Sequence, residues 1–329
     1  MLRAAPGTLD EFRGLFSESP DPRQWPHVAT AVTYQRAIGV LSEQLGCEAT
    51  EEAVYARRLA SDPADYAAEL LRATGVELLL VDDGFPTEDI GTSWRELGAL
   101  AGCPSRPVMR IERVAESSGG ALDAVRAEVG GARERGFAAL KTIAAYRGGL
   151  DLDALGPPAG ADRLEGAPVR EVLLAALEAN EASGDPLPVQ VHTGFGDSDL
   201  SLPRARPGLL KPLIERFRHT SFVLLHCYPF VREAGWLAHV YGNVYFDLSL
   251  TIPHVARPAV ALAEALELAP VSKLLYASDA ALTPELYLLA ARWWRDALAA
   301  VLPEVLPRAS VEPAARMILR DNALVLYRL

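Results

Sequence analysis

The stretch FVLLHCYPFVREAGWLAHVYGNVYFDLS, residues 222–249, holds a strand, a helix and a second strand in succession. Phe222–His226 and Val244–Leu248 are short runs of aliphatic and aromatic residues that favour strands, and Arg232–Tyr241 between them has helical periodicity. Strands that are apolar throughout are typical of a sheet covered on both faces, and a helical crossover joins parallel strands. The stretch therefore predicts a βαβ unit of a parallel sheet.

The same alternation extends over most of the chain. Five further runs favour strands: Val76–Val81, Pro107–Val114, Phe137–Ala144, Val189–His192 and Lys273–Ser278. Helical patterns occupy the intervals: Leu122–Arg135, Val169–Ala182, Gly208–His219, Pro258–Leu266 and Glu285–Ala300. This α/β alternation predicts an open doubly wound sheet or a closed TIM-type (β/α) barrel. A barrel has eight strands, and the seven that can be counted all begin after residue 75.

The two ends of the chain have helical patterns. Residues 1–75 are expected to form an N-terminal helical segment packed on the barrel, and residues 76–329 the barrel with a C-terminal helix, in a single domain overall. The expected terminal helices are Tyr34–Leu45, Glu51–Ala60, Ala64–Thr74 and Val311–Leu329. Ser61-Asp62-Pro63 is a start signal for the third of these, and Gly156–Gly160 is an expected loop.

Composition excludes several classes of partner. The chain has 32 Lys and Arg against 43 Asp and Glu, a net charge of −11, and no basic block, which argues against nucleic acid and anionic membranes. Its apolar runs fall well short of the roughly 20 residues of a membrane-spanning helix. Met1–Pro20 lacks the apolar core of a signal peptide, so we expect a cytoplasmic protein with a small-molecule substrate, and a homodimer as the prior for its assembly. Three cysteines without CxxC spacing are expected to be reduced thiols.

Four chemically capable side chains fall at or near strand ends. Lys141 lies inside the run Phe137–Ala144, His192 and His226 each end a run, and Asp279 directly follows one. In a parallel barrel the carboxyl ends of all strands open onto one mouth, so these side chains are expected to converge. Neutral imidazoles with a carboxylate suit zinc or a similar divalent ion, which activates water for hydrolysis.

Each of these residues also has a structural alternative. A single strand-end histidine is more often a hydrogen-bonded structural residue than a ligand. Asp279 is also a potential N-cap for the next helix, although Thr283-Pro284 competes for that position. Lys141 in a strand interior must be paired, neutral or modified. Asp247 is expected to support the mouth. The remaining histidines are expected to be structural or on the surface: His27, His219, His239 and His254.

Four segments carry a resemblance to a known family. They are LKTIAAYRGGL (140–150), VQVHTGFGDSD (189–199), VLLHCYPFVREAGWLAHVYGNVYFDLS (223–249) and KLLYASDA (273–280). With these the chain resembles the amidohydrolase-related group of the amidohydrolase superfamily. It is similar to the subgroup that includes the amidohydrolase-like domain fused to glutamine synthetase in some fungal and plant proteins.

The resemblance implies a distorted eight-stranded barrel with one or two divalent metals, zinc first and manganese second. It implies that His192 and His226 are the fifth-strand and sixth-strand ligands. Asp279 would be the eighth-strand carboxylate that also serves as general base. Lys141 takes the fourth-strand position, which in some members is a carbamylated lysine between two metals. The implied reaction is attack of metal-activated water on a C–N or ester-like bond of a small polar substrate.

The chain departs from the family pattern at its start. The family's first strand carries a His-x-His metal-binding pair, and this sequence contains no such pair. This implies a start codon assigned too late or a barrel that lacks its first strand, and it leaves a non-catalytic, truncated barrel as an alternative. Metal-dependent non-oxidative decarboxylation, which part of the superfamily performs, is the other alternative.

The substrate side is expected near the same mouth. Arg147 and Arg232 follow the fourth and sixth expected strands, where each would bind a substrate carboxylate or form a structural ion pair. Asp197 and Asp199 lie beside His192 and either shape the pocket or turn the chain. Tyr228 is a further candidate lining residue.

Overall fold

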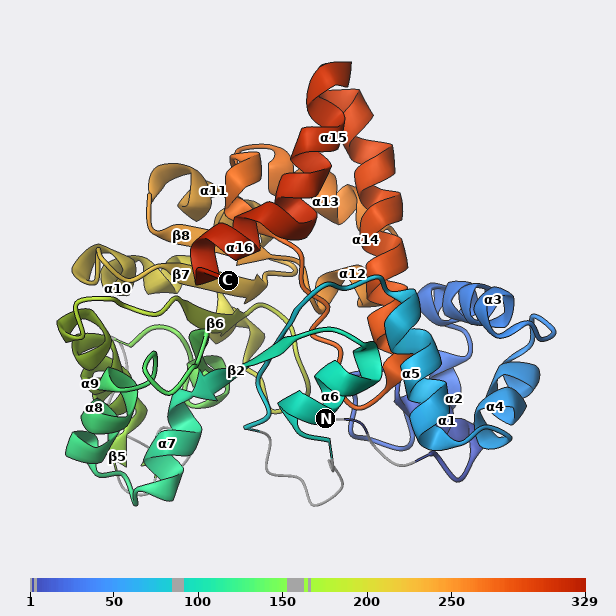
Figure 1. The fold of residues 1–329 in the computed structure, drawn as a ribbon, viewed down its shortest axis with the longest axis horizontal. Coiled ribbons are helices and arrows are strands. Elements are labelled where there is room, and N and C mark those ends of the chain that lie inside the picture. The colour runs from blue at the N-terminus through green and yellow to red at the C-terminus, as the bar shows by residue number, and fades with distance from the viewer. Residues whose placement is uncertain (1, 3–4, 85–91, 153–162, 165–166) are drawn as a thin grey trace.

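Seven parallel strands form the centre of the fold. The structure, a computed structural model, describes residue 2 and residues 5–84, 92–152, 163–164 and 167–329; the predicted loop Gly156–Gly160 lies outside these ranges. The strands are β1 (Leu79–Val81), β2 (Ser105–Arg110), β3 (Ala139–Thr142), β6 (Val189–Thr193), β7 (Phe222–His226), β8 (Val244–Asp247) and β9 (Leu274–Leu275). They pair in sequence order, each parallel to the next, and the sheet curls as a partial barrel (Figure 1). The TIM-type architecture is thereby confirmed.

Helices follow the strands and cover the outside of this sheet. They are α6 (Trp94–Ala101), α7 (Ile111–Ser117), α8 (Leu122–Gly130), α9 (Val169–Ala182), α10 (Lys211–Arg216), α11 (Val231–Val240), α12 (Thr251–His254), α13 (Pro258–Leu266) and α14 (Pro284–Val305). A separate antiparallel pair, β4 (Arg163–Leu164) and β5 (Ala167–Pro168), precedes α9. Within the described part of the chain, no helix has both the length and the apolar character needed to cross a bilayer.

Several predicted strands are shorter than expected. Val76–Val81 is a strand only at Leu79–Val81, and Phe137–Ala144 only at Ala139–Thr142. The run Pro107–Val114 leaves the strand after Arg110, because Ile111 and Ala115, one helical turn apart in α7, are both buried in the core. The run Lys273–Ser278 is a strand only at Leu274–Leu275. Beyond it the backbone bonds to helical segments instead, since Tyr276 donates its N–H to Ile318 and Ala277 accepts from the Trp294 indole.

The N-terminal helices form a group beside α14, in blue in Figure 1. They are α1 (Leu9–Gly14), α2 (Trp25–Val28), α3 (Val32–Leu45), α4 (Glu51–Leu59) and α5 (Pro63–Ala73). Asp62 caps α5 by accepting from the backbone N–H groups of Ala64 and Asp65, which confirms the predicted start signal. Arg58 of α4 reaches Glu285 of α14 at 2.5 Å, and both side chains are buried. This pair ties the N-terminal helices to the barrel.

The closing helix is interrupted by a wider turn. α15 (Arg308–Arg316) continues through a π-helical turn, Met317–Asp321, into α16 (Asn322–Tyr327), which agrees with the predicted C-terminal helix. At the end of α16, the hydroxyl of Tyr327 accepts from Gln190 Nε2 of β6 at 3.0 Å.

The core has two parts, and the smaller one lies under the candidate site. It consists of one inward-facing set of strand side chains closed by Tyr327: Val108, Ala139, Val223, Leu225, Leu275 and Tyr327. The larger cluster packs the other strand faces against the helices. Apart from the contact of Gln190 with Tyr327, the floor of the barrel is thus apolar, and the candidate polar groups lie above it at the carboxyl ends of the strands.

The two edges of the described sheet are β1 and β9. Leu2 forms an isolated parallel bridge with Leu282, in the segment between β9 and α14. The described start of the chain therefore lies next to the segment that follows Asp279.

Candidate active site at the carboxyl ends of the strands

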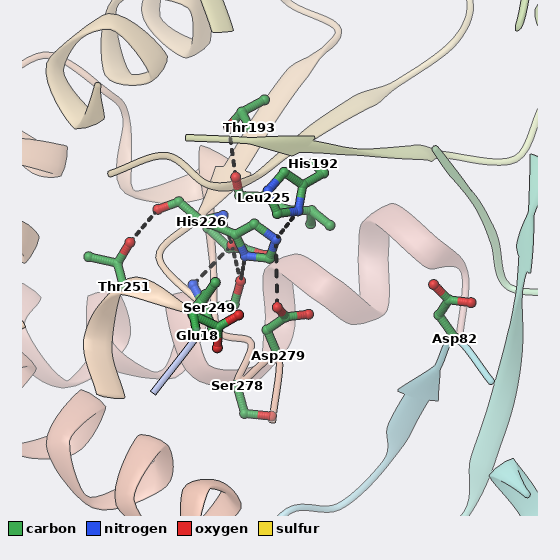
Figure 2. A network of polar contacts seen from close by, with 12 residues as sticks. Glu18, Asp82, His192, Thr193, Leu225, His226, Ser249, Thr251, Ser278 and Asp279 are labelled. Atoms are coloured by element: carbon green, nitrogen blue, oxygen red, sulfur yellow. Dashed lines mark hydrogen bonds and ion pairs between the residues drawn. The ribbon is translucent and has the colours of Figure 1, made fainter. Parts of the chain in front are cut away.

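Two buried histidines meet at the ends of neighbouring strands. Nε2 of His226, on β7, lies 3.0 Å from Nδ1 of His192, on β6, and Figure 2 shows the two rings side by side. Burial lowers the pKa of both imidazoles well below the ordinary value, and for His192 the neighbouring His226 and Lys141 act in the same direction. Both rings are therefore neutral near pH 7. The predicted convergence of these two histidines is observed.

A serine and an aspartate set the orientation of His226. Asp247 Oδ1 accepts from the His226 backbone N–H at 2.8 Å and from the Ser249 hydroxyl at 2.7 Å. Because the single Ser249 hydroxyl proton is used on Asp247, Ser249 Oγ accepts from Nδ1–H of His226, also at 2.7 Å. The His226 ring consequently carries its proton on Nδ1 and directs a lone pair on Nε2 toward His192. Asp247 supports the mouth, as expected.

Left-handed backbone conformations turn the site residues toward the mouth. In β7, Val223 and Leu225 belong to the inner cluster, so strict alternation would direct His226 to the opposite face. His226 and Cys227 both have φ of 67°, and Asp279 has φ of 48°. Such conformations are strained for non-glycine residues and are retained where surrounding contacts hold them. Thr251 provides one such contact by donating to the His226 carbonyl at 2.6 Å.

Asp279 completes the central group. Its Oδ2 lies 3.6 Å from His226 Nε2, and its Oδ1 lies 3.8 Å from Lys141 Nζ. One third of the side chain is exposed, so the carboxylate is open to the mouth. The alternative role as an N-cap does not hold, because α14 begins at Pro284 with Thr283 in the cap position.

Lys141 belongs to an ion-pair network on the side of the mouth formed by β1, β2 and β3. Its Nζ lies 3.8 Å from Asp82 Oδ2, which also accepts from Arg110 Nη2 at 2.5 Å. Of the three states considered for this lysine, the structure shows ion pairing. Asp82 and Arg110 were not predicted as site residues, although each lies at the carboxyl end of a strand, β1 and β2. Figure 2 shows Asp82 across the mouth from Asp279.

Tyr146 packs against the site from the loop after β3. Its ring meets the His192 ring edge-on, with centroids 4.7 Å apart. A Cβ atom at Gly196 would lie 1.8 Å from the Tyr146 hydroxyl oxygen, so only glycine fits there. Gly196 in VQVHTGFGDSD therefore allows Tyr146 to approach His192.

Glu18 enters the mouth from the N-terminal segment, between α1 and α2. Figure 2 shows it beside Ser249 and Asp279. Burial, together with the carboxylates of Asp279 and Asp197, raises the pKa of Glu18 to about 7. Nothing in the local sequence indicated this placement, because a single acidic residue in a loop has no periodicity. Only the packing of the N-terminal helices on the barrel brings it there.

His254, expected to be structural or superficial, faces the same mouth. Its Nε2 lies 3.7 Å from Glu18 Oε1, and its ring centroid lies 5.8 Å from that of Phe195. The ring is held by Nδ1, which lies 2.8 Å from the carbonyl oxygen of Leu250. His254 comes from α12, directly after the segment that carries Ser249.

The predicted substrate residues have varied surroundings. Arg147 Nη2 lies 3.1 Å from Glu116, and Arg232, mostly exposed, lies 3.3 Å from Glu264, so both form the ion pairs considered as their alternative. Asp197 accepts from the backbone of Asp199 at 2.9 Å and so helps turn the chain. Tyr228 is partly exposed and lines a pocket with Phe195. Contact of these residues with a substrate stays a prediction.

The donor chemistry partly fits a divalent ion. Two neutral imidazoles and a carboxylate are ligand types suited to zinc, and Nε2 of His192, which is buried, has no hydrogen-bond partner. However, the described residues contain no group of three or more His, Cys, Asp and Glu side chains arranged to hold a metal. His192, His226 and Asp279 thus converge without forming a complete ligand shell.

The second half of the sequence matches a known family. Residues 155–329 match the family described as Amidohydrolase. The protein fluG of Emericella nidulans is 29% identical over 361 residues, covering 91% of this chain and 41% of that protein. The chain thus spans about two fifths of the length of this relative.

Solved structures share the fold. A protein named a metal-dependent hydrolase, from Lactobacillus casei ATCC 334, is 28% identical with a TM-score of 0.85, covering 98% of this chain and 91% of its own. A uronate isomerase of Bacillus halodurans C-125 is 10% identical with a TM-score of 0.62, covering 98% and 83% of the two chains. At that identity the isomerase supports the fold alone.

Proposed function

Because this chain belongs to the amidohydrolase family, we propose that it is a divalent-metal-dependent hydrolase acting on a C–N or ester-like bond of a small polar substrate. The observation that carries the proposal is the approach of His192 Nδ1, His226 Nε2 and Asp279 Oδ2 at the mouth of the barrel. The same mouth is where barrel enzymes place their chemistry.

Three residues would hold the ion: His192, His226 and Asp279. Zinc is the first choice because imidazole suits it, and manganese is the second. Lys141, 3.8 Å from Asp279, is the candidate for carbamylation if a second ion binds. When bound, such an ion supplies water of lowered pKa and polarises the bond under attack.

The chain's own groups have complementary tasks. Ser249 and Asp247 keep the proton of His226 on Nδ1, so Nε2 remains a lone-pair donor. His192 must release its Nδ1 proton, now directed at His226, before it can bind a cation through that atom. Its unpartnered Nε2 is the atom free to take that proton.

Asp279 is the proposed general base. Its carboxylate is open to water at the mouth, and the Lys141 ammonium lies 3.8 Å from it. It would accept a proton from the attacking water and return it to the leaving nitrogen or oxygen. The reaction therefore needs no other proton carrier.

Metal content tests the proposed ligands. Protein purified after growth with zinc or manganese is expected to carry at least one ion per chain. His192→Ala and Asp279→Ala are expected to lose most of it, whereas His219→Ala, an exposed control, keeps it. Equal metal content in all four proteins would exclude these ligands.

A substrate panel tests the reaction. Amides, lactones and aromatic carboxylic acids are incubated with the zinc- or manganese-loaded protein, and products are separated by mass spectrometry. Hydrolysis of an amide or lactone, lost in Asp279→Ala, is the expected result. Release of carbon dioxide instead would indicate the decarboxylase alternative, and absence of any turnover in a metal-loaded protein would favour a binding module.

A further inference from the structure

A small pocket opens beside the proposed metal centre. It has a volume of about 330 Å³ and is lined mainly by apolar and aromatic side chains: Phe195, Leu202, Tyr228, Pro229, His254, Val255 and Ala256. Phe195 follows His192 by three positions, and Tyr228 follows His226 by two. The segments that directly follow the two candidate ligands therefore form part of this pocket.

The aromatic rings are arranged edge to face. The ring centroids of Phe195 and Tyr228 lie 6.1 Å apart at 84°, and those of Phe195 and His254 lie 5.8 Å apart at 71°. Such a group of aromatic faces binds apolar moieties and also attracts organic cations through the ring quadrupoles.

His254 is a polar residue of the pocket lining, and the Glu18 carboxylate lies next to it, 3.7 Å from its Nε2. Since the Leu250 carbonyl can only accept, Nδ1 of His254 carries the hydrogen in their 2.8 Å contact, and neutral Nε2 is left with a lone pair. Nε2 is buried without a hydrogen-bond partner and faces Glu18 Oε1 at 3.7 Å. When Glu18 is ionised, its carboxylate and the imidazole lone pair thus face each other with no donor between them.

We propose that this place binds a primary ammonium group of the substrate, between Glu18 and His254, with the attached apolar group on Phe195 and Tyr228. An ammonium has three N–H donors and one positive charge, which matches two acceptors of which one is anionic. The inference rests on the proposed function for its link to catalysis, because it makes the substrate an amine-bearing amide or ester.

The surrounding charges favour a cation over a neutral group. Among the described residues, no Lys or Arg lies within ion-pair distance of the Glu18 carboxylate, and Asp197 and Asp279 are its charged neighbours. Lys141, the cation of the central group, is directed at Asp82 and Asp279. A substrate ammonium would supply the missing positive charge, whereas a neutral group would not.

Two isosteric probes test the proposal at pH 7.5 by calorimetry on the protein as purified: benzylamine, which is cationic, and benzyl alcohol, which is neutral. Benzylamine is expected to bind at least tenfold more tightly. Glu18→Gln is expected to lose at least tenfold in benzylamine affinity and to leave benzyl alcohol unchanged. Asp21→Asn, which removes an exposed charge from the same loop, is expected to change neither.

Equal affinity for the two probes, or unchanged benzylamine binding in Glu18→Gln, would overturn the proposal. Phe195→Leu gives an independent check and is expected to weaken benzylamine binding severalfold. Nitrogen-15 chemical shifts of His254 give a structural check. A doubly protonated His254 ring paired with Glu18 in the free protein would leave no acceptor for the ammonium and would also overturn the proposal. These readouts do not involve turnover, so failure of the hydrolase assays would leave them unaffected.

Discussion

The Ser249 hydroxyl lies 2.7 Å from Nδ1 of His226 and accepts a hydrogen bond from Nδ1–H, which determines the tautomer of a histidine 23 residues earlier in the sequence. The serine in turn is held by Asp247, whose pKa is raised to about 6 by burial and which is therefore mostly ionised at neutral pH. This relation leads to the first prediction, because a ligand histidine binds a metal only through a nitrogen that lacks a proton.

Ser249→Ala removes the acceptor of Nδ1–H and is expected to weaken zinc affinity by about 10–100-fold, as typical for loss of an outer-shell partner. Competition with a chromophoric chelator measures the dissociation constant. Ser249→Thr keeps the hydroxyl and should restore most of the affinity. Ser183→Ala, at the end of α9, is the control. An unchanged zinc dissociation constant in Ser249→Ala would show that Ser249 does not determine the tautomer of His226.

Trp294 holds the segment that carries Asp279. Its buried indole N–H donates to the carbonyl of Ala277 at 3.0 Å, two residues before Asp279. Trp294→Phe is expected to cost about 1 kcal/mol for the lost hydrogen bond, with some further loss from the smaller ring, and to lower metal content. Trp293→Phe, equally buried on the same helix, should lower stability without lowering metal content. Thermal melts measure the stability of both variants, and metal analysis measures their metal content.

The pair of Arg58 and Glu285 attaches the N-terminal helices to α14. The Tyr66 hydroxyl also donates to Glu285, at 2.9 Å, and Thr283 donates to the same carboxylate. Glu285→Ala leaves Arg58 buried without its charge partner and is expected to lower the free energy of unfolding by about 3–5 kcal/mol in urea titrations. Arg23→Ala, which breaks an exposed pair with Asp21, should leave the free energy of unfolding nearly unchanged. Similar losses of unfolding free energy in Glu285→Ala and Arg23→Ala would contradict the role given to the buried pair.

The raised pKa of Glu18 should make the free energy of unfolding depend on pH. Its folded-state pKa of about 7 exceeds the ordinary 4.5, so the native state retains a proton that the unfolded chain releases between these values. The stability from this group is therefore present below about pH 4.5 and is lost as the pH rises toward 7. Unfolding of metal-free wild type and Glu18→Gln at pH 5 and pH 8 is expected to show Gln gaining relative to Glu at the higher pH. A gain at pH 5 instead would reverse the sign and refute the assignment.

Local sequence patterns were sufficient for most of the elements. The helices Val169–Ala182 and Pro258–Leu266 and the strand Phe222–His226 have the predicted bounds, because periodicity and flanking turn residues act within a few positions. The strand end was also enough to locate His192, His226 and Asp279, since every parallel strand presents its carboxyl end to one mouth. Four predicted strands were too long: Val76–Val81, Pro107–Val114, Phe137–Ala144 and Lys273–Ser278. A strand continues only where a neighbour is available to pair with it, and at Ile111 the chain enters a helix instead.

The tertiary structure decided which side chains complete the site. Glu18 and His254 meet through the packing of the N-terminal segment on the barrel, and Arg110 meets Asp82 through the register of β1 and β2. His226 faces inward only because its backbone turns left-handed at the strand end. Each of these depends on distances between segments far apart in the chain, and residue types in one segment carry no information about them. Periodicity determines which face an element buries, whereas contacts across elements are determined by how the whole chain closes.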